Sequence, residues 1–513
     1  MLSRQMKTIL FALSLFSAFF FLAFSTIERN EFPDDFLFGT ATSSFQVEGS
    51  LKGGKGLSNW DVFTHIPGTI ADGSDADVAD DHYSLFREDI ELLHSLGVNS
   101  YRFSLAWSRI LPKGRFEGIN PEGIAFYNDL IDALVQKGIQ PFVTLHHFEI
   151  PQELEERYAS WLSSQIIEDF AYFAEVCFTA FGDRVKYWTT FNEPNTFLKF
   201  GYLNGRWTPR RCSPPYGHCE AGDSETEPYI AGHNLILSHA AATDIYRKKF
   251  QAAQGGKIGI VVSPNWYEPL RNTPEDLSAA HRLLVSDVGW FLDPIILGDY
   301  PFEMREVLRS KLPNFTLEEK ELLKIKVDFI GINHYTSLYA KDCISSPCAL
   351  DPLNGNMHAS ASGTRDGLLI GPPTGMPHFF VVPYGIEKII MYVKDRYNNT
   401  PMYITENGYS DNNVGTKDEL VNDIKRVHFM QNYLPYVNSA MRSGADVRGY
   451  FAWSFLDNFE WTLGYTKRFG IVYVDYETMA RTPKLSAEWY KGFLTGNEIV
   501  SMDKKHAIYI CLE

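Results

Sequence analysis

Two glutamates, Glu193 and Glu406, each follow a short apolar stretch of the chain, and their type and placement suggest chemistry. The stretches, YWTTFN (187–192) and PMYIT (401–405), are rich in the aromatic and β-branched residues that are typical of β-strands. Each strand would therefore carry a carboxylate at its own end. Two facing carboxyl groups roughly 5 Å apart suit a retaining glycosidase, in which one is the nucleophile and the other acts first as acid and then as base.

The two carboxylates meet only if both strands turn the matching face toward a shared interior. Because side chains alternate along a strand, the predicted face-mates are Phe191, Thr189 and Tyr187 for Glu193, and Ile404 and Met402 for Glu406. On spacing alone two alternatives stay open. One is an aspartic-protease pair, which must be close enough to share one proton. The other is a structural role, with a buried arginine satisfying each glutamate.

The two stretches belong to a series of strand-like runs that alternate with helix-like runs. These runs are almost continuously apolar, as expected for parallel strands buried on both faces. The predicted strands span residues 36–47, 99–106, 140–147, 185–192, 257–263, 327–333, 401–406 and 447–454. The helical patterns between them include residues 81–96, 122–137, 164–181, 229–250 and 385–397.

Several predicted helices end at a glycine before the next strand, namely Gly97, Gly138, Gly182 and Gly444, which is the usual C-cap signal. Eight strands alternating with helices predict an α/β fold, a single-domain (β/α)8 barrel. A doubly wound open sheet is the runner-up. It is disfavoured because no glycine-rich phosphate loop follows the first strand.

Active sites of such barrels lie at the C-terminal ends of the strands. Polar or aromatic residues occupy most of the predicted ends: Gln46, Arg102, His147, Asn192, Asn333, Tyr335, Trp453 and the segment 457–461. Their convergence on one face predicts a pocket for a hydroxyl-rich ligand.

Composition restricts the partners of this chain of 513 residues. It has 47 Lys and Arg against 63 Asp and Glu, a net charge of −16, and no Lys/Arg-rich run. Nucleic acids and acidic membrane surfaces are therefore poor partners. No Gly/Ser-rich linker divides the chain, which favours one domain.

The N-terminus predicts entry into the secretory pathway. Arg4 and Lys7 precede an apolar run at 9–24, and Ser25 follows it, as in a signal peptide over residues 1–25. The mature chain would then span 26–513, with a barrel core at about 32–495 and a short C-terminal tail, and it would not stay inserted in a membrane. An uncleaved anchor is the alternative, because the run is near the lower limit for a spanning helix.

The cysteines and two Asn-X-Thr triplets agree with an oxidising compartment. Cys212 with Cys219, and Cys343 with Cys348, would each close a short loop as a disulfide. No metal site is predicted, because there is no CxxC motif and no histidine flanks the cysteines at ligand spacing. Glycosylation sequons begin at Asn314 and Asn398.

Two motifs identify a family. TFNEP (190–194) and YITENG (403–408) resemble the two catalytic signatures of glycoside hydrolase family 1, the β-glucosidase family. The resemblance covers nearly the whole mature chain, including FLFGTATSSFQVEGS (36–50), YRFSLAWSRILP (101–112), VTLHHFEIPQELE (143–155), IGINHYTS (330–337) and the segment 449–475. It implies the (β/α)8 barrel and a cofactor-free retaining β-glucosidase acting on terminal non-reducing β-D-glucosyl residues of small O-glucosides.

The resemblance also implies residue roles. Glu193 would be the general acid/base and Glu406 the nucleophile, with Asn192 contacting the sugar 2-hydroxyl. Arg102 and Tyr335 would flank Glu406 and keep it ionised. The implied sugar-binding set comprises Gln46, His147, Asn192, Asn333, Tyr335, Trp453 (as the platform beneath the ring), Glu460, Trp461 and Phe469.

Differences between this sequence and two subgroups of the family narrow the range of expected substrates. Plant thioglucosidases resemble this pattern but have Gln at the position of Glu193, so an O-glucoside is expected. Glu460 stands where 6-phosphoglycosidases of the family lack a carboxylate, so an unphosphorylated sugar is expected.

On the leaving-group side, one residue differs from the pattern of many plant members of the family. His378 in GPPTGMPHFFVVP (371–383) stands where many plant members have an aglycone-stacking Trp. LSNWDVFTH (57–65), GINHYTS (331–337) and the Cys343/Cys348 loop resemble the monolignol β-glucosidases, which implies coniferin-type glucosides, a role in lignification and a cell-wall location, with the vacuole as alternative.

Two other functions stay open beside hydrolysis. A transglucosidase would use the same double displacement with an alcohol or acid acceptor instead of water. An inactive sugar-binding protein is the second, against which the intact Glu193 and Glu406 argue.

Overall fold

The computed structural model describes residues 27–49 and 51–496. The predicted signal peptide and most of the predicted C-terminal tail lie outside these described residues.

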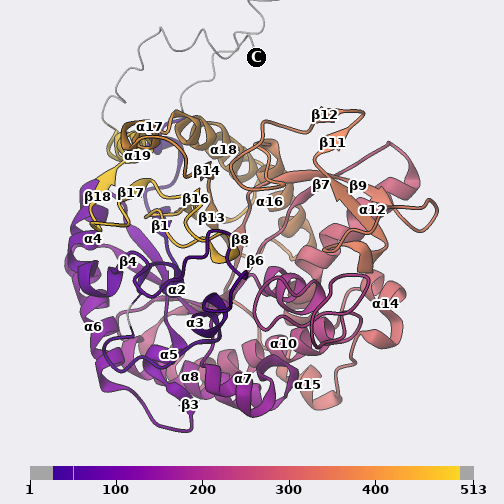
Figure 1. The fold of residues 1–513 in the computed structure, drawn as a ribbon, viewed down its shortest axis with the longest axis horizontal. Helices are drawn as coiled ribbons and strands as arrows, with labels where there is room; N and C mark the ends of the chain where they lie inside the picture. Colours follow the sequence, from indigo (N-terminus) through magenta and orange to yellow (C-terminus); the bar gives the residue numbers. More distant parts are fainter. Residues whose placement is uncertain (1–26, 50, 497–513) are drawn as a thin grey trace, which may run out of the picture.

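Within the described residues, eight parallel strands close into a barrel in which neighbours in the chain are neighbours in space (Figure 1). They are β1 (Leu37–Ala41), β2 (Ser100–Ser104), β4 (Gln140–His146), β5 (Tyr187–Asn192), β6 (Lys257–Val262), β8 (Phe329–Asn333), β13 (Met402–Asn407) and β15 (Val447–Trp453). β1 pairs with both β2 and β15, which closes the ring. The predicted barrel is confirmed and the open-sheet alternative is wrong.

Long helices surround the strands, as Figure 1 shows. They are α4 (His82–Leu96), α6 (Pro121–Gln136), α8 (Gln165–Phe181), α10 (Glu227–Ile245), α12 (Pro274–Leu284), α16 (Tyr384–Arg396), α18 (Ile424–Arg442) and α19 (Leu485–Thr495). The five predicted helices match members of this set, and α10 continues through a π-helical turn to Phe250. Gly97 has the left-handed conformation expected of a C-cap, whereas Gly182 is right-handed.

Shorter helices and strands occupy the connections. The helices are α2 (Ser44–Val47), α3 (Asn59–Thr64), α5 (Trp107–Ile110), α7 (Gln152–Tyr158), α9 (Pro194–Leu198), α11 (Gln251–Gln254), α13 (Trp290–Leu292), α14 (Phe302–Leu308), α15 (Leu317–Leu322) and α17 (Lys417–Val421). The strands are β3 (Pro112–Arg115), β7 (Trp266–Pro269), β9 (Ser337–Asp342), β10 (Ala359–Ser362), β11 (Thr364–Arg365), β12 (Leu368–Leu369), β14 (Asp411–Asn412), β16 (Lys467–Arg468), β17 (Val472–Val474) and β18 (Arg481–Pro483).

The first predicted strand, 36–47, is too long. β1 ends at Ala41, and Ser44 begins the short helix α2, which carries Gln46. The Ser44 backbone N–H donates to Ser104 Oγ at the end of β2. This bond turns the chain out of the sheet, so Gln46 reaches the barrel mouth from a helix instead of a strand.

An aromatic cluster fills the barrel interior. Phe142 stacks on Tyr187 (ring centroids 5.2 Å apart) and meets Phe329, Tyr403 and Phe451 edge-on at 5.4, 5.4 and 5.1 Å. These rings come from five different strands, so the interior is a packed core and not a pore. They form the floor beneath the strand ends that carry Glu193 and Glu406.

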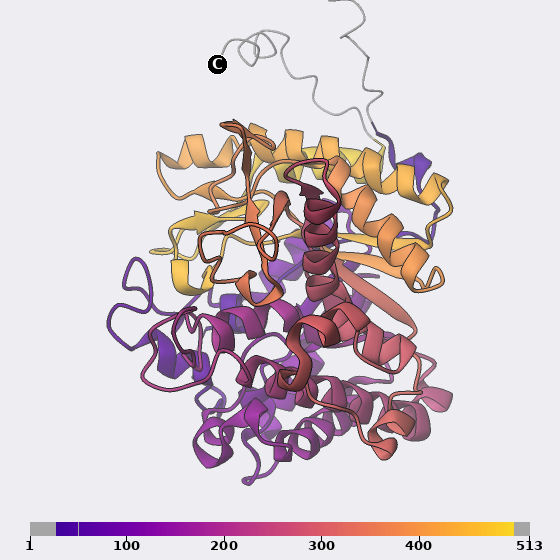
Figure 2. The same ribbon diagram turned by 90° about the vertical axis from the view of Figure 1, so that its right-hand side faces the viewer.

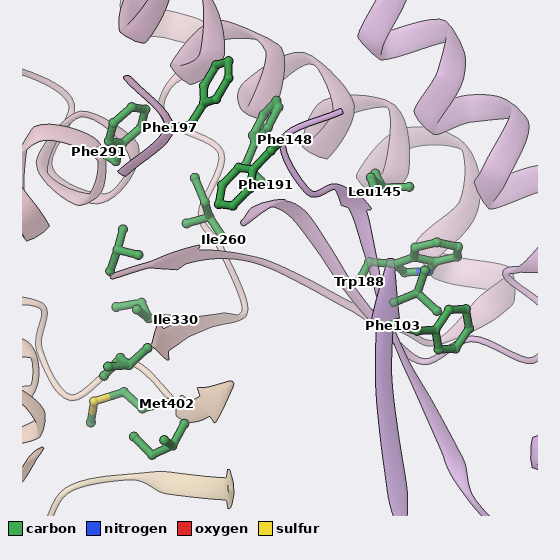
Figure 3. Close-up of a cluster of buried hydrophobic side chains, with 14 of the residues drawn as sticks. Phe103, Leu145, Phe148, Trp188, Phe191, Phe197, Ile260, Phe291, Ile330 and Met402 are labelled. Carbon is green, nitrogen blue, oxygen red and sulfur yellow. The ribbon is translucent and has the colours of Figure 1, made fainter. Parts of the chain in front are cut away.

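The strand-face prediction is partly wrong. Phe191, Met402 and Ile404 belong to the large cluster between strands and helices, which Figure 3 draws around Phe191 and Met402. Register shifts cause the difference: one lies between Thr189 and Asn192 on β5, and another follows Ile404 on β13. Each shift changes the phase of the alternation before the strand ends.

In Figure 2 the N-terminal part of the chain (indigo to magenta) lies mainly in the lower part of the molecule, and the C-terminal part (orange to yellow) lies mainly in the upper part. Glu193 comes from the first half and Glu406 from the second, so their site forms only when the ring closes. The cysteine pairs Cys212–Cys219 and Cys343–Cys348 are disulfide-bonded, and Cys177 is a buried free thiol. None of the helices described in the structure is long and apolar enough to span a membrane.

Candidate active site

Both carboxylate oxygens of Glu406 are held by hydrogen bonds. Arg102 Nη1 on β2 donates to Oε1 at 2.6 Å, and the Tyr335 hydroxyl donates to Oε2 at 2.6 Å. All three side chains are buried. Charge-assisted bonds of this kind fix the orientation of a carboxylate and favour its ionised form.

Glu193 lies just beyond the end of β5 in a left-handed backbone conformation, with φ 44°. Asn333 Nδ2, at the end of β8, donates to Glu193 Oε1 at 2.6 Å. Within the described residues no cation forms an ion pair with Glu193 comparable to the one between Arg102 and Glu406. The two glutamates thus occupy one site but different electrostatic surroundings.

Asn192 links these surroundings. Its Oδ1 accepts from Arg102 Nη2 at 2.6 Å and from Asn333 Nδ2 at 3.0 Å. With Oδ1 acting as the acceptor, Nδ2 is the donor to His147 Nε2 at 3.1 Å. A single network therefore joins strands β2, β4, β5, β8 and β13.

The two carboxyl groups differ in acidity. Burial, and then the negative charge of Glu406, raise the pKa of Glu193 to about 8. Burial also raises the pKa of Glu406, but the Arg102 guanidinium and the Tyr335 hydroxyl act against it. Glu193 is therefore the group that keeps a proton at neutral pH, whereas Glu406 is the one whose anion has a cation and a hydroxyl donor beside it.

Gln46 and the segment after β15 form one wall of the site. Gln46 Nε2 donates to Asn458 Oδ1 at 3.1 Å and to the Phe459 carbonyl at 2.9 Å. Asn458 belongs to the segment 457–461 that the sequence places at the end of the eighth strand, but the sequence predicts no separate role for it.

Aromatic rings surround His147 at the mouth. Trp453 and Trp461 stack on the imidazole at 5.9 and 6.0 Å. In the described part of the chain, neither His147 Nδ1 nor Glu460 Oε2 has a hydrogen-bond partner, although both atoms are buried. Burial and the charges of Glu406 and Glu193 raise the pKa of Glu460 to about 8. Unpaired buried polar atoms facing a network of this kind suit a ligand that supplies hydroxyl groups.

In the segment 371–383, the residue beside the site is not His378, which the sequence places at the aglycone position, but its neighbour Phe379. His378 is exposed and left-handed (φ 64°), whereas its neighbour Phe379 stacks on Tyr335 with ring centroids 5.4 Å apart. Phe379 and Met376 pack against the cluster that contains Tyr335, Trp453 and Phe469. Sequence reasoning missed Phe379 and Met376, because the turn at His378 decides which side chain faces the site.

A closed barrel with two buried glutamates at its mouth, one held by an arginine and a tyrosine and the other with a raised pKa, has the architecture of a glycoside hydrolase. Comparison with known proteins agrees: the model of glycosyl hydrolase family 1 matches residues 28–499. The chain belongs to this family and is a glycoside hydrolase.

Relatives cover nearly the full length of the chain. A probable inactive β-glucosidase 14 from Oryza sativa is 60% identical over 92% of this chain and 92% of its own. A coniferin β-glucosidase from Pinus contorta is 51% identical over 94% of this chain and 95% of its own. Among solved structures, a mutant rice β-glucosidase in a covalent complex with Glc has a TM-score of 0.88 at 45% identity, covering 91% of this chain and 99% of its own.

Proposed function

We propose that this protein is a retaining β-glucosidase in which Glu193 is the general acid/base and Glu406 the nucleophile. The observation that carries the proposal is the opposite treatment of the two buried glutamates: Arg102 and Tyr335 hold Glu406, while burial beside Glu406 raises the pKa of Glu193 to about 8. A retaining mechanism needs this division of roles.

In the first step a Glu406 oxygen attacks the anomeric carbon and the bond to the leaving oxygen breaks. Glu193 gives its proton to that oxygen. Ester formation removes the charge of Glu406, which lowers the pKa of Glu193. In the second step Glu193 takes a proton from water, the water oxygen attacks the anomeric carbon, and Glu406 leaves as a carboxylate.

The proposed sugar contacts follow from the buried polar atoms that have no hydrogen-bond partner among the described residues. His147 Nδ1 and Glu460 Oε2 would bind sugar hydroxyls, with Trp453 as the platform for the ring. Asn192, held by Arg102 and Asn333, would present its amide to the 2-hydroxyl. Glu460 is a buried acid with no paired cation among the described residues, so it offers a phosphate no countercharge, which supports an unphosphorylated glucoside.

For the leaving group we propose a monolignol glucoside such as coniferin. The 51% identity to a coniferin β-glucosidase supports this class, and so do the aromatic ring of Phe379 and the thioether of Met376 beside the site. The disulfides support passage through the secretory pathway, with Asn314 and Asn398, both exposed, as glycosylation sites and the cell wall as the destination.

Two variants test the function. Glu406→Ala should lower kcat/KM for an aryl β-glucoside by about 10⁴-fold or more, since it removes the attacking group. Glu477→Ala, which changes an exposed glutamate, is the control and should leave the rate unchanged. Hydrolysis that survives in Glu406→Ala would overturn the assignment of the nucleophile. A wild-type protein without activity would place it with its relative that is named probable inactive.

Products and a substrate panel settle the finer points. Glucose as the only product in the presence of alcohol acceptors supports hydrolysis over transglucosylation. Coniferin and syringin should be cleaved with higher kcat/KM than flavonoid or cyanogenic glucosides, and equal rates would contradict the monolignol proposal.

A further inference from the structure

The turn that carries Glu193 is conformationally costly. Glu193 has φ 44° and ψ 52°, a left-handed conformation in which the Cβ of a non-glycine residue crowds its own backbone. Its backbone N–H still donates to the Val261 carbonyl of β6 at 3.0 Å. The chain then leaves the sheet through Pro194, which has no N–H to donate. The orientation of Glu193 therefore depends on what holds the residues that follow.

The Asn195 side chain ties this turn to the barrel. Its Nδ2 donates to the Ser263 carbonyl at 2.9 Å, and its Oδ1 accepts from the Ser263 N–H at 3.2 Å. Only 2% of Asn195 is exposed. One carboxamide thus donates to and accepts from the same backbone residue, as a peptide group does in a β-ladder.

This pairing continues the β5–β6 ladder beyond the backbone. The last ladder pair is Asn192 with Val261, and Ser263 lies two residues further along. Glu193 itself is bonded to Val261 through its N–H and to Asn333 and Thr196 through its carboxyl group. The backbone bonds from the N–H groups of Thr196 and Phe197 to the Glu193 carbonyl only join the turn to α9 and move with that helix. The Asn195 carboxamide therefore fixes α9, and with it the turn at Glu193, to β6.

We propose that Asn195 is a positioning residue for the general acid/base, holding Glu193 in the left-handed turn that presents its carboxyl to the leaving oxygen. This inference rests on the proposed role of Glu193. Both polar ends of the Asn195 side chain are engaged by Ser263, so the residue acts through Glu193 and not on the substrate.

A displaced acid has a recognisable effect on kinetics. Asn195→Ala should lower kcat/KM by about 10- to 100-fold for an alkyl β-glucoside, whose leaving oxygen needs a proton. For 2,4-dinitrophenyl β-glucoside, which needs no proton to leave, kcat/KM should stay within about twofold. With that substrate kcat and KM should fall together, because the glycosyl-enzyme accumulates. Azide, which attacks without base assistance, should restore kcat.

Three further variants make the test decisive. Asn195→Asp keeps an acceptor for the Ser263 N–H and should show the same substrate dependence with a smaller loss; it replaces the alanine variant if that protein does not fold. Asn438→Ala removes another buried amide that donates to a backbone carbonyl, that of Glu31, at 2.8 Å, and should change both substrates equally. Glu193→Gln supplies the reference pattern for a lost acid.

The outcomes separate the two proposals. Equal losses for both substrates in Asn195→Ala, or no loss, would overturn the positioning role. If Glu193→Gln shows the leaving-group dependence and the Asn195 variants do not, the inference about Asn195 alone fails. If Glu193→Gln lacks the dependence as well, the role of Glu193 as acid/base is wrong.

Discussion

The two sides of the site are built in different ways. The proposed sugar side, formed by Gln46, His147, Asn192 and Glu460, comes from strand ends and adjoining segments of the barrel and is buried and polar. The proposed aglycone side, formed by Met376, His378 and Phe379, comes from the long connection between β8 and β13 and is half-buried or exposed.

Because of this difference, we expect the sugar side to serve the reaction common to all glucosides and the aglycone side to determine which leaving group is preferred. The proposed sugar side is tied to Glu193 and Glu406 through the network of Arg102, Asn192 and Asn333, so we expect a change there to affect every glucoside. The aglycone side touches that network through the stacking of Phe379 on Tyr335 and can vary in a loop without altering the barrel. Variants on the two sides should therefore differ in whether the loss depends on the leaving group.

The largest expected effect of the four changes that follow comes from Glu193→Gln. For an unactivated aryl β-glucoside, kcat/KM should fall by about 10²- to 10⁴-fold. The wild-type value should decline as pH rises through about 8, because burial and Glu406 raise the pKa of Glu193 to about 8 and the step needs the protonated form. The glutamine cannot lose a proton, so a pH profile of the variant should lack this limb. If the decline of kcat/KM above about pH 8 persists unchanged in the variant, a group other than Glu193 causes it.

Glu460→Gln should have the next largest effect, a loss of about 10- to 100-fold in kcat/KM that is equal for coniferin and methyl β-glucoside. The reason is that Glu460 Oε2, buried and without a partner among the described residues, would bind the sugar common to both. Kinetics on the two substrates check this. A loss confined to coniferin would move Glu460 to the aglycone side.

The comparison also explains how far the sequence predicts the structure. Eight apolar runs predict the barrel because parallel strands buried on both faces have a distinctive pattern. The position of a residue at the end of a strand predicts the convergence of Arg102, Asn192, Asn333 and Glu406, since strand ends of a barrel meet at one face.

The facing of individual side chains could not be predicted. The register shifts before Asn192 and Glu406 leave no mark in the alternation of residue types, so Phe191 and Ile404 were assigned to the wrong face. Ser44 begins a helix because of a bond to Ser104, which is 60 residues away. The left-handed turn at His378, which places Phe379 beside Tyr335, is equally a property of the folded loop.

On the aglycone side, Phe379→Ala should lower kcat/KM for coniferin by about 10-fold while the value for methyl β-glucoside stays within about twofold, because only an aromatic leaving group gains from the ring. His378→Ala, at the exposed neighbour, should change neither value by more than about twofold. Equal losses for both substrates in Phe379→Ala would mean that the ring acts through Tyr335 on Glu406. A coniferin-specific loss in His378→Ala would return the aglycone contact to that residue.

The smallest expected effect concerns stability. It tests whether ionisation of a buried acid near the proposed sugar side destabilises the fold. Glu149, two residues after His147 in the chain, is buried, and burial raises its pKa to about 8. A carboxyl whose pKa is higher in the folded than in the unfolded state stabilises the fold below the unfolded value, and this stabilisation is lost as pH rises to about 8.

Glu149→Gln removes that titration. Urea unfolding should therefore show the variant gaining stability relative to the wild type between pH 5 and 8, by up to about 1.4 kcal/mol per pH unit. Asp366→Asn, on the β11–β12 hairpin of the connection between β8 and β13, changes an exposed acid beside Arg271 and keeps Glu149, so it is the control and its stability should follow that of the wild type. If the free energy of unfolding changes with pH in the same way in both variants, the buried acid Glu149 destabilises the fold no more than the exposed acid Asp366. The two sides of the site would then differ only in their hydrogen bonding.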